Sequence, residues 1–180
     1  LQLLWQNEQV VAVKESSGNV AQIGEVARTL PAGKTLLSGD DNLALASIAV
    51  GAEGLVSVLG NMVPRETKQL VDAARSGKRD AAVKLNNRLL PLIDALFVES
   101  NPIPLKAGLQ MMGLGGDFVR LPLVPASEAT RARLKEALAH AGIKGFSTQK
   151  LKSFLGGAPV GGPGSPEDTP EGIPFNVGLW

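Results

Sequence analysis

The sequence predicts an α/β fold with a small parallel sheet, followed by a region of helices. Three short apolar segments, residues 10–14, 35–37 and 55–59, have the composition of strands buried on both faces, and a polar or glycine-containing turn follows each. Each turn leads into a segment with apolar residues at helical spacing. Because strands that alternate with helices form parallel sheets covered by those helices, this order predicts three strand–helix units.

A short apolar segment precedes the first predicted strand. Residues 1–6 have the spacing of a last helical turn, and residues 10–14 form the first strand. The helix expected over 20–30 needs a side chain that accepts hydrogen bonds from its free N–H groups. A serine at 16–17 or Asn19 can serve as that cap.

The second and third units follow the same plan. Strand 35–37 precedes a polar loop, 38–42, whose Asp or Asn side chains can cap a buried helix over 43–50. After strand 55–59, Pro64 opens another helix at a position where its missing N–H costs nothing.

The rest of the chain divides into a helical region and a tail. The predicted elements are helices over 80–98 and 105–112, an extended stretch over 121–125, and a helix from the capping residue Ser127 to Gly142. The remainder is rich in glycine and proline and is predicted to be flexible. The expected domains are residues 1–77, 78–144 and 145–180.

Composition limits the function. The net charge of +1, from 18 basic and 17 acidic side chains, gives no electrostatic reason to expect a nucleic-acid or membrane partner. The chain has no cysteine and one histidine, His140, so thiolate metal sites are excluded and a Ser-His triad is disfavoured. His140 is expected at the surface. The chain begins at Leu1 rather than at a methionine, and we expect it to be a fragment.

Lys14 ends the first apolar segment. Successive side chains of a strand point to opposite faces, so Lys14 shares its face with Ala12 and Val10. Burial lowers the pKa of a lysine, and the neutral amine is a nucleophile that forms a Schiff base with a carbonyl compound. The alternative is that Lys14 simply ends the strand and extends into solvent.

The loops after the other two strands strengthen the signal from Lys14. In parallel α/β folds, ligands bind at the carboxyl ends of the strands, where Lys14 would meet the 38–40 loop and Val56–Ser57. Asp40 and Asp41 could serve acid–base chemistry, although a carboxylate at a helix N-cap is the commoner arrangement.

Two glycine-containing motifs are rejected as nucleotide sites. Residues 33–35 read Gly-Lys-Thr, but the first glycine of a phosphate loop would fall on Arg28, and a helix precedes the motif where a strand is required. The Gly-Leu-Gly-Gly segment at 113–116 follows a helix, so it is not a dinucleotide fingerprint.

Four segments together resemble the dihydrodipicolinate synthase family. They are Val-Ala-Val-Lys-Glu-Ser-Ser-Gly-Asn (11–19), Leu-Leu-Ser-Gly-Asp-Asp (36–41), Gly-Leu-Val-Ser-Val (54–58) and Phe-Val-Glu-Ser-Asn-Pro-Ile-Pro-Leu-Lys (97–106). The similarity covers about residues 1–143 and is closer than that to the related N-acetylneuraminate lyases. It implies the last three strand–helix units of a (β/α)8 TIM barrel, followed by a C-terminal helical domain.

The resemblance also implies a reaction. Lys14 would form an imine with pyruvate, and the resulting enamine would attack aspartate semialdehyde, as in lysine biosynthesis through diaminopimelate, with no metal or organic cofactor. Val56 would line the pyruvate pocket, and Gly39 and Asn101 would lie near the second substrate. The family further implies a cytoplasmic homotetramer.

Several functional residues of the family have no counterpart in this chain. The threonines that bind the pyruvate carboxylate, the proton-relay tyrosines and a substrate-binding arginine belong to the part of the barrel that the similarity does not cover. Two alternatives therefore stand beside the synthase: a catalytically impaired piece that acts only in assembly, and another pyruvate-dependent aldolase. Open sheet edges predict that the isolated chain associates with copies of itself.

Overall fold

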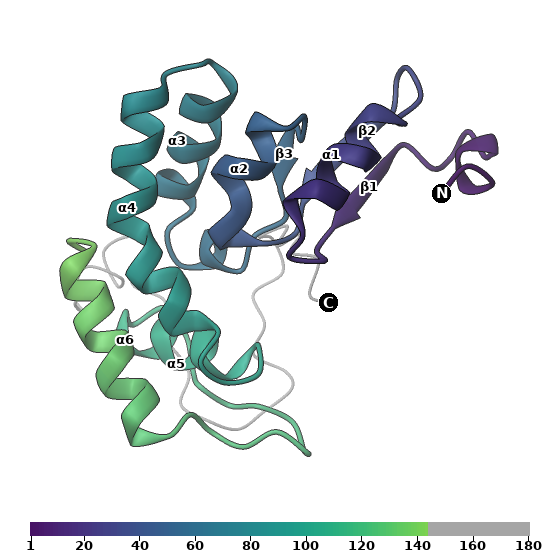
Figure 1. Ribbon diagram of the computed structural model, residues 1–180. Helices are drawn as coiled ribbons and strands as arrows, with labels where there is room; N and C mark the ends of the chain where they lie inside the picture. Colours follow the sequence, from purple (N-terminus) through teal and green to yellow (C-terminus); the bar gives the residue numbers. More distant parts are fainter. Residues whose placement is uncertain (144–180) are drawn as a thin grey trace, which may run out of the picture. The chain divides into compact units, whose positions relative to one another are not determined.

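The computed structural model describes residues 1–143 and contains the predicted parallel sheet. Strands β1 (Ala12–Glu15), β2 (Thr35–Ser38) and β3 (Gly54–Leu55) lie in the order β1-β2-β3 (Figure 1). The register pairs Lys14 with Leu37, and Ser38 with Leu55. Within the described residues, β1 and β3 are therefore the edges of the sheet.

Helices α1 (Val20–Arg28) and α2 (Ala44–Ala49) belong to the first two units. Of the candidate caps, Asn19 is the one that caps α1, because its side-chain oxygen accepts hydrogen bonds from the N–H groups of Ala21 at 3.0 Å and Gln22 at 3.3 Å. A small buried cluster joins this layer to one face of the sheet. Its members are Ile23, Val26, Leu36 and Ala52.

The third strand is shorter than the sequence predicts. The apolar run suggested a strand over residues 55–59, but β3 ends at Leu55 and the chain turns into the 3-10 helix η3 (Leu59–Asn61). Burial explains the apolar residue at the end of this run, since Leu59 is 1% exposed and joins the core beneath α3 (Pro64–Arg75). Pro64 opens α3 as predicted.

The helical region consists of α4 (Arg79–Leu96), α5 (Ile103–Met111) and α6 (Glu128–His140), and α6 runs beside α4 (Figure 1). These helices share one large buried cluster with α3 and η3. The stretch predicted to be extended at 121–125 forms no strand. Ser127 caps α6, because its hydroxyl accepts from the N–H of Thr130 at 3.2 Å.

Two further predictions concern the ends of the chain. The expected helical turn at residues 1–6 is the 3-10 helix η1 (Leu4–Gln6), which has no buried residue. The predicted flexible tail at 145–180 lies outside the described residues. None of the helices in residues 1–143 has the length and apolar character needed to cross a membrane.

Candidate active site

Lys14, Gly39 and Val56 lie on one face of the sheet, opposite the face that packs against α1. Lys14, Leu37 and Gly54 form one row across the three strands in the register. Gly39 and Val56 come two residues after Leu37 and Gly54, and alternate residues of a strand share a face. The ladder continues past both strand ends, because Gly39 N–H donates to Glu15 C=O at 2.7 Å and Val56 N–H donates to Ser38 C=O at 2.8 Å.

Gly39 lies directly under the side chain of Lys14. A Cβ atom at position 39 would be 3.0 Å from both Cγ and Cδ of Lys14 and 2.1 Å from Oγ of Ser16. Only a glycine leaves room for these two side chains, so the absence of a side chain at position 39 has a steric reason. The structure therefore brings together two of the residues that the sequence singled out.

Of the two interpretations of Lys14, the structure agrees with the one in which its side chain extends into solvent. Lys14 is exposed, whereas its neighbour Glu15 is 7% exposed on the opposite face. The apolar run before Lys14 suggested a strand covered on both sides, but no element of residues 1–143 covers the face of Lys14, and β1 is an edge strand. This part of the chain therefore leaves the Lys14 side chain open to solvent.

Asp40 and Asp41 do not cap the helix that follows them. Asp40 accepts hydrogen bonds from Ser16 Oγ at 3.1 Å and Gly18 N–H at 3.2 Å, both in the loop after β1. Asp41 accepts from Ser57 Oγ and from the N–H groups of Val58 and Leu59, in the turn after β3. The two adjacent carboxylates thus connect the three loops at the carboxyl ends of the strands.

Asp41 is the buried member of this pair. Asp41 is only 1% exposed to solvent. Burial raises the pKa of the Asp41 carboxyl above its ordinary value, and the hydrogen bonds from Ser57, Leu59 and Val58 oppose that shift. The turn after β3 is therefore held by a carboxylate whose solvation has been replaced by protein donors.

Asn101 lies in the connection between α4 and α5, before a cis peptide bond to Pro102. Among residues 1–143, no hydrogen bond joins Asn101 to the loops at the strand ends. Two residues earlier, Glu99 accepts hydrogen bonds from Thr130 Oγ1 at 2.5 Å and from Ser127 N–H at 3.1 Å, which lower the pKa of the Glu99 carboxyl. This connection is thereby fixed to the start of α6.

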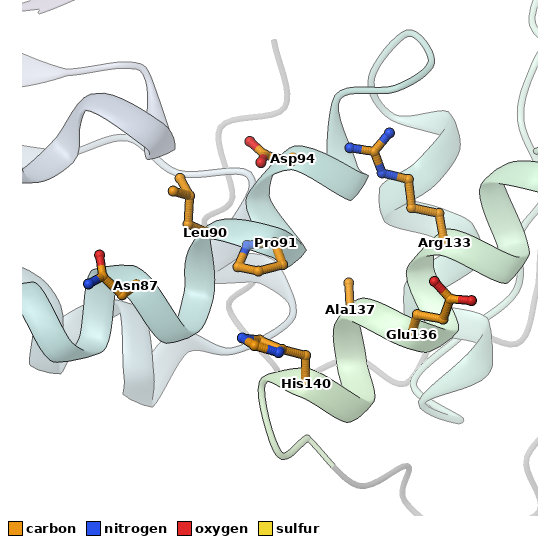
Figure 2. A pocket seen from close by; sticks show the side chains of 8 residues that line it. All are labelled: Asn87, Leu90, Pro91, Asp94, Arg133, Glu136, Ala137 and His140. Atoms are coloured by element: carbon orange, nitrogen blue, oxygen red, sulfur yellow. The ribbon is translucent and has the colours of Figure 1, made fainter.

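Two neighbouring pockets, which share Asp94 and Arg133, lie along the helical region, and the second also borders the strand-end loops. The first, of about 450 Å³, lies between α4 and α6, where His140 and Ala137 face Leu90 and Pro91 (Figure 2). The second, of about 620 Å³, is lined by Ser16, Ser17, Gly18, Asp40, Asn42, Leu43, Ile93, Asp94, Phe97 and Arg133. Neither pocket includes Lys14, Gly39 or Val56. His140 is exposed at the end of α6, as predicted.

Sequence reasoning missed the hydrogen bonds made by Ser16 and Ser57. Both serines stand in loops after strands, and a carboxylate in the loop after the neighbouring strand gave no local signal that it would reach them. The described residues contain no group of three or more His, Cys, Asp or Glu side chains placed to hold a metal ion.

Comparison with known proteins places this geometry in a family. The family model described as the dihydrodipicolinate synthetase family matches residues 1–141. A 4-hydroxy-tetrahydrodipicolinate synthase from Archaeoglobus fulgidus is 43% identical over 131 residues, which cover 73% of this chain and 45% of that protein. One from Koribacter versatilis is 46% identical over 134 residues, covering 74% and 45%. The chain thus spans about half the length of the curated relatives it matches.

Solved structures agree with the sequence comparison. The crystal structure of dihydrodipicolinate synthase from Aquifex aeolicus matches with a TM-score of 0.75 at 38% identity, covering 79% of this chain and 48% of that one. The synthase from Methylacidiphilum fumariolicum matches with a TM-score of 0.75 at 35% identity, covering 86% and 50%. The predicted α/β architecture is that of part of a TIM-barrel enzyme. By its sequence and its fold, the chain belongs to the dihydrodipicolinate synthetase family.

Proposed function

We propose that this chain carries the Schiff-base lysine of a lyase that condenses pyruvate with L-aspartate 4-semialdehyde. The product is 4-hydroxy-tetrahydrodipicolinate, a precursor of lysine in the diaminopimelate route. One observation carries the proposal: Lys14 lies at the carboxyl end of β1 on the same face as Gly39 and Val56, in a member of this family. Ligands of parallel α/β proteins bind at that end of the sheet.

The chemistry starts with the amine of Lys14. Its neutral Nζ adds to the C2 carbonyl of pyruvate, and uptake of one proton from solvent with loss of one water gives a protonated imine. The imine withdraws electrons, so a proton leaves the neighbouring methyl group and an enamine forms. The enamine carbon attacks the aldehyde of the semialdehyde and forms the new carbon–carbon bond. The amino group of the second substrate then replaces Lys14 at the imine carbon, which closes the ring and frees the lysine.

Three other residues have roles in this proposal. Val56, 39% exposed, offers an apolar wall beside the imine for pyruvate. Gly39 leaves space for the Lys14 side chain and for a second substrate above β2. Asn101 would bind that substrate from the α4–α5 connection. The connection reaches the strand-end loops, because Phe97 lines the same pocket as Ser16 and Asp40.

The whole reaction needs more than these residues. The chain contains no tyrosine, so it cannot supply a tyrosine proton relay of the kind the family uses. General acid–base catalysis contributes roughly 10²–10⁴-fold to a rate. We therefore propose imine formation at Lys14 as the step that this chain supplies. A homotetramer in the cytoplasm is the setting in which the complete site would act.

The test is reductive trapping. The protein is treated with pyruvate and borohydride, and its intact mass and peptide map are recorded. We expect a reduced pyruvyl adduct at Lys14, absent from Lys14→Ala and retained in Lys34→Ala. Lys34 is a matched control, because it precedes β2 at the opposite end of the sheet and hydrogen-bonds backbone oxygens of Asn7 and Glu8. An adduct spread evenly over surface lysines would contradict the proposal.

A second candidate function follows from the exposure of Lys14. A chain with an open sheet face and exposed apolar side chains could act only as a piece of an assembly, without turnover of its own. Assay of the chain alone and after mixing with a chain that completes the barrel separates the two. Another pyruvate-dependent aldolase would form the same adduct and differ only in the aldehyde it accepts.

A further inference from the structure

Asp41 stands out among the carboxylates of the described residues. It is 1% exposed, and its carboxylate makes its hydrogen bonds with the turn that follows β3 rather than with the loop that follows β1. An isolated carboxylate is costly to bury, and the cost is offset only by donors placed around it. Its donors come from the consecutive residues Ser57, Val58 and Leu59, so the carboxylate acts on one short segment.

We propose that Asp41 is a positioning residue that fixes the turn after β3 and thereby holds Val56 on the face of Lys14. The inference rests on the proposed function, in which Val56 lines the pyruvate end of the site. Asp41 does not touch the substrate in this scheme. It acts through the backbone of residues 57–59.

Val56 is held from both sides in this arrangement. On one side its N–H donates to Ser38 C=O at 2.8 Å, which continues the ladder between β2 and β3. On the other side Asp41 holds Ser57, and the hydroxyl of Ser57 also accepts from Gly60 N–H at 2.7 Å. The Val56 side chain is 39% exposed and belongs to no buried cluster. Its place therefore depends on the backbone rather than on packing of its own.

The chemistry of the contact explains why a carboxylate is used. Two of the donors are backbone N–H groups and the third is a hydroxyl, and a carboxylate accepts from all of them at once. Hydrogen bonds to a charged acceptor are shorter and stronger than those between neutral groups. An asparagine has the same shape, but its NH₂ group cannot accept from an N–H donor. It could keep part of the contact by donating to Ser57.

The experiment measures how trapping at Lys14 depends on carbonyl concentration. Asp41→Ala and Asp41→Asn are compared with the parent and with Asp80→Asn, whose side chain is fully exposed at the start of α4. We expect Asp41→Ala to raise the half-saturating pyruvate concentration about tenfold, Asp41→Asn to raise it less, and Asp80→Asn to leave it unchanged. Val56→Ala should reproduce the effect, and Asp41→Ala should add little to it.

A second carbonyl separates positioning from general loss of structure. Glyoxylate forms an imine but lacks the methyl group that Val56 would contact. Trapping of glyoxylate should therefore change much less than trapping of pyruvate in Asp41→Ala. Hydrogen exchange at the Val58 and Leu59 amides should become faster in that variant, while exchange in α4 stays slow.

The outcomes are distinct. No adduct at Lys14 in the parent chain overturns the proposed function and this inference with it. An adduct in the parent that Asp41→Ala leaves unchanged, with faster exchange at residues 58–59, overturns only the positioning role. If trapping of pyruvate and trapping of glyoxylate fall equally in Asp41→Ala, the role of Asp41 is purely structural and the inference is also overturned.

Discussion

The sheet region and the helical region of this chain are stabilised very differently. The sheet layer rests on the small cluster of Ile23, Val26, Leu36 and Ala52. The helical region has a continuous core to which η3, α3, α4, α5 and α6 all contribute, with Leu89, Leu92 and Leu96 at 0% exposure. Because the free energy of folding scales with buried apolar area, we expect the helical region to be the more stable of the two.

The residues proposed to act in the chemistry lie in the region with the smaller buried cluster. Lys14, Gly39 and Val56 stand on a sheet face that nothing in residues 1–143 covers, and the loops around them are connected by Asp40 and Asp41 rather than by packing. A chain with this arrangement keeps its site in position through a few hydrogen bonds. Functional loops are commonly drawn from the least stable parts of a protein.

The largest effect we expect is association through the sheet. Val11, 64% exposed beside edge strand β1, leaves an apolar edge open to another copy of the chain. The parent chain should form oligomers or aggregates at micromolar concentration, and Val11→Lys should shift it toward monomer, as measured by sedimentation velocity. Val124→Lys, at a 60% exposed residue of the helical region, is the control and should have little effect. A parent chain that sediments as a single monomer would contradict the comparison.

Removing a core leucine should destabilise the two regions in different ways. Leu92→Ala leaves a cavity in the large cluster and should lower the free energy of unfolding by about 2–5 kcal/mol. Leu36→Ala, in the small cluster, should speed hydrogen exchange of β1, β2 and α1 while α4 remains protected. If both variants exchange uniformly along residues 1–143, the two regions unfold as one unit and the distinction fails.

Much of the fold could be predicted from the sequence. Periodicity located the strands, the helices and the caps at Asn19 and Ser127, because these signals are local. The order of strands and helices predicted the parallel sheet. The predicted length of β3 was wrong, because Leu59 is buried in the core beneath α3 and not by strand pairing.

The site was predicted only in part, and for a physical reason. The strand–helix order placed Lys14, the 38–40 loop and Val56–Ser57 at the carboxyl ends of the strands, and the register adds that Lys14, Gly39 and Val56 share one face. Burial of Lys14 depends on whatever covers that face, which no pattern around residue 14 can report. The contacts of Asp41 with Ser57 are equally non-local, since 16 residues separate the two.

Gly39→Ala tests how closely the site is packed. The new methyl group would meet Ser16 Oγ at 2.1 Å and Lys14 Cγ and Cδ at 3.0 Å, so both side chains must move. We expect reductive trapping of pyruvate at Lys14 to fall, with a loss of stability of about 1–3 kcal/mol. Gly116→Ala is the matched control, because a Cβ atom there meets nothing within 4 Å. Unchanged trapping in Gly39→Ala would show that the Lys14 side chain does not need its present path.

The smallest effects should appear in the pH dependence of stability, with opposite sign in the two regions. The pKa of Asp41 is raised above 3.8 in the folded chain, so its contribution is complete below that pH and is lost as the pH rises through the folded value. The pKa of Glu99 is lowered below 4.5, so its contribution is present above that pH and is lost as the pH falls through the folded value. Melting temperatures are measured from about pH 3 to 7. The melting temperature of the parent should fall relative to that of Asp41→Asn as the pH rises, and relative to that of Glu99→Gln as the pH falls. Parallel curves for the parent and both variants would mean that neither carboxylate titrates differently in the folded chain, and that the hydrogen bonds fixing the two loops are not held in solution.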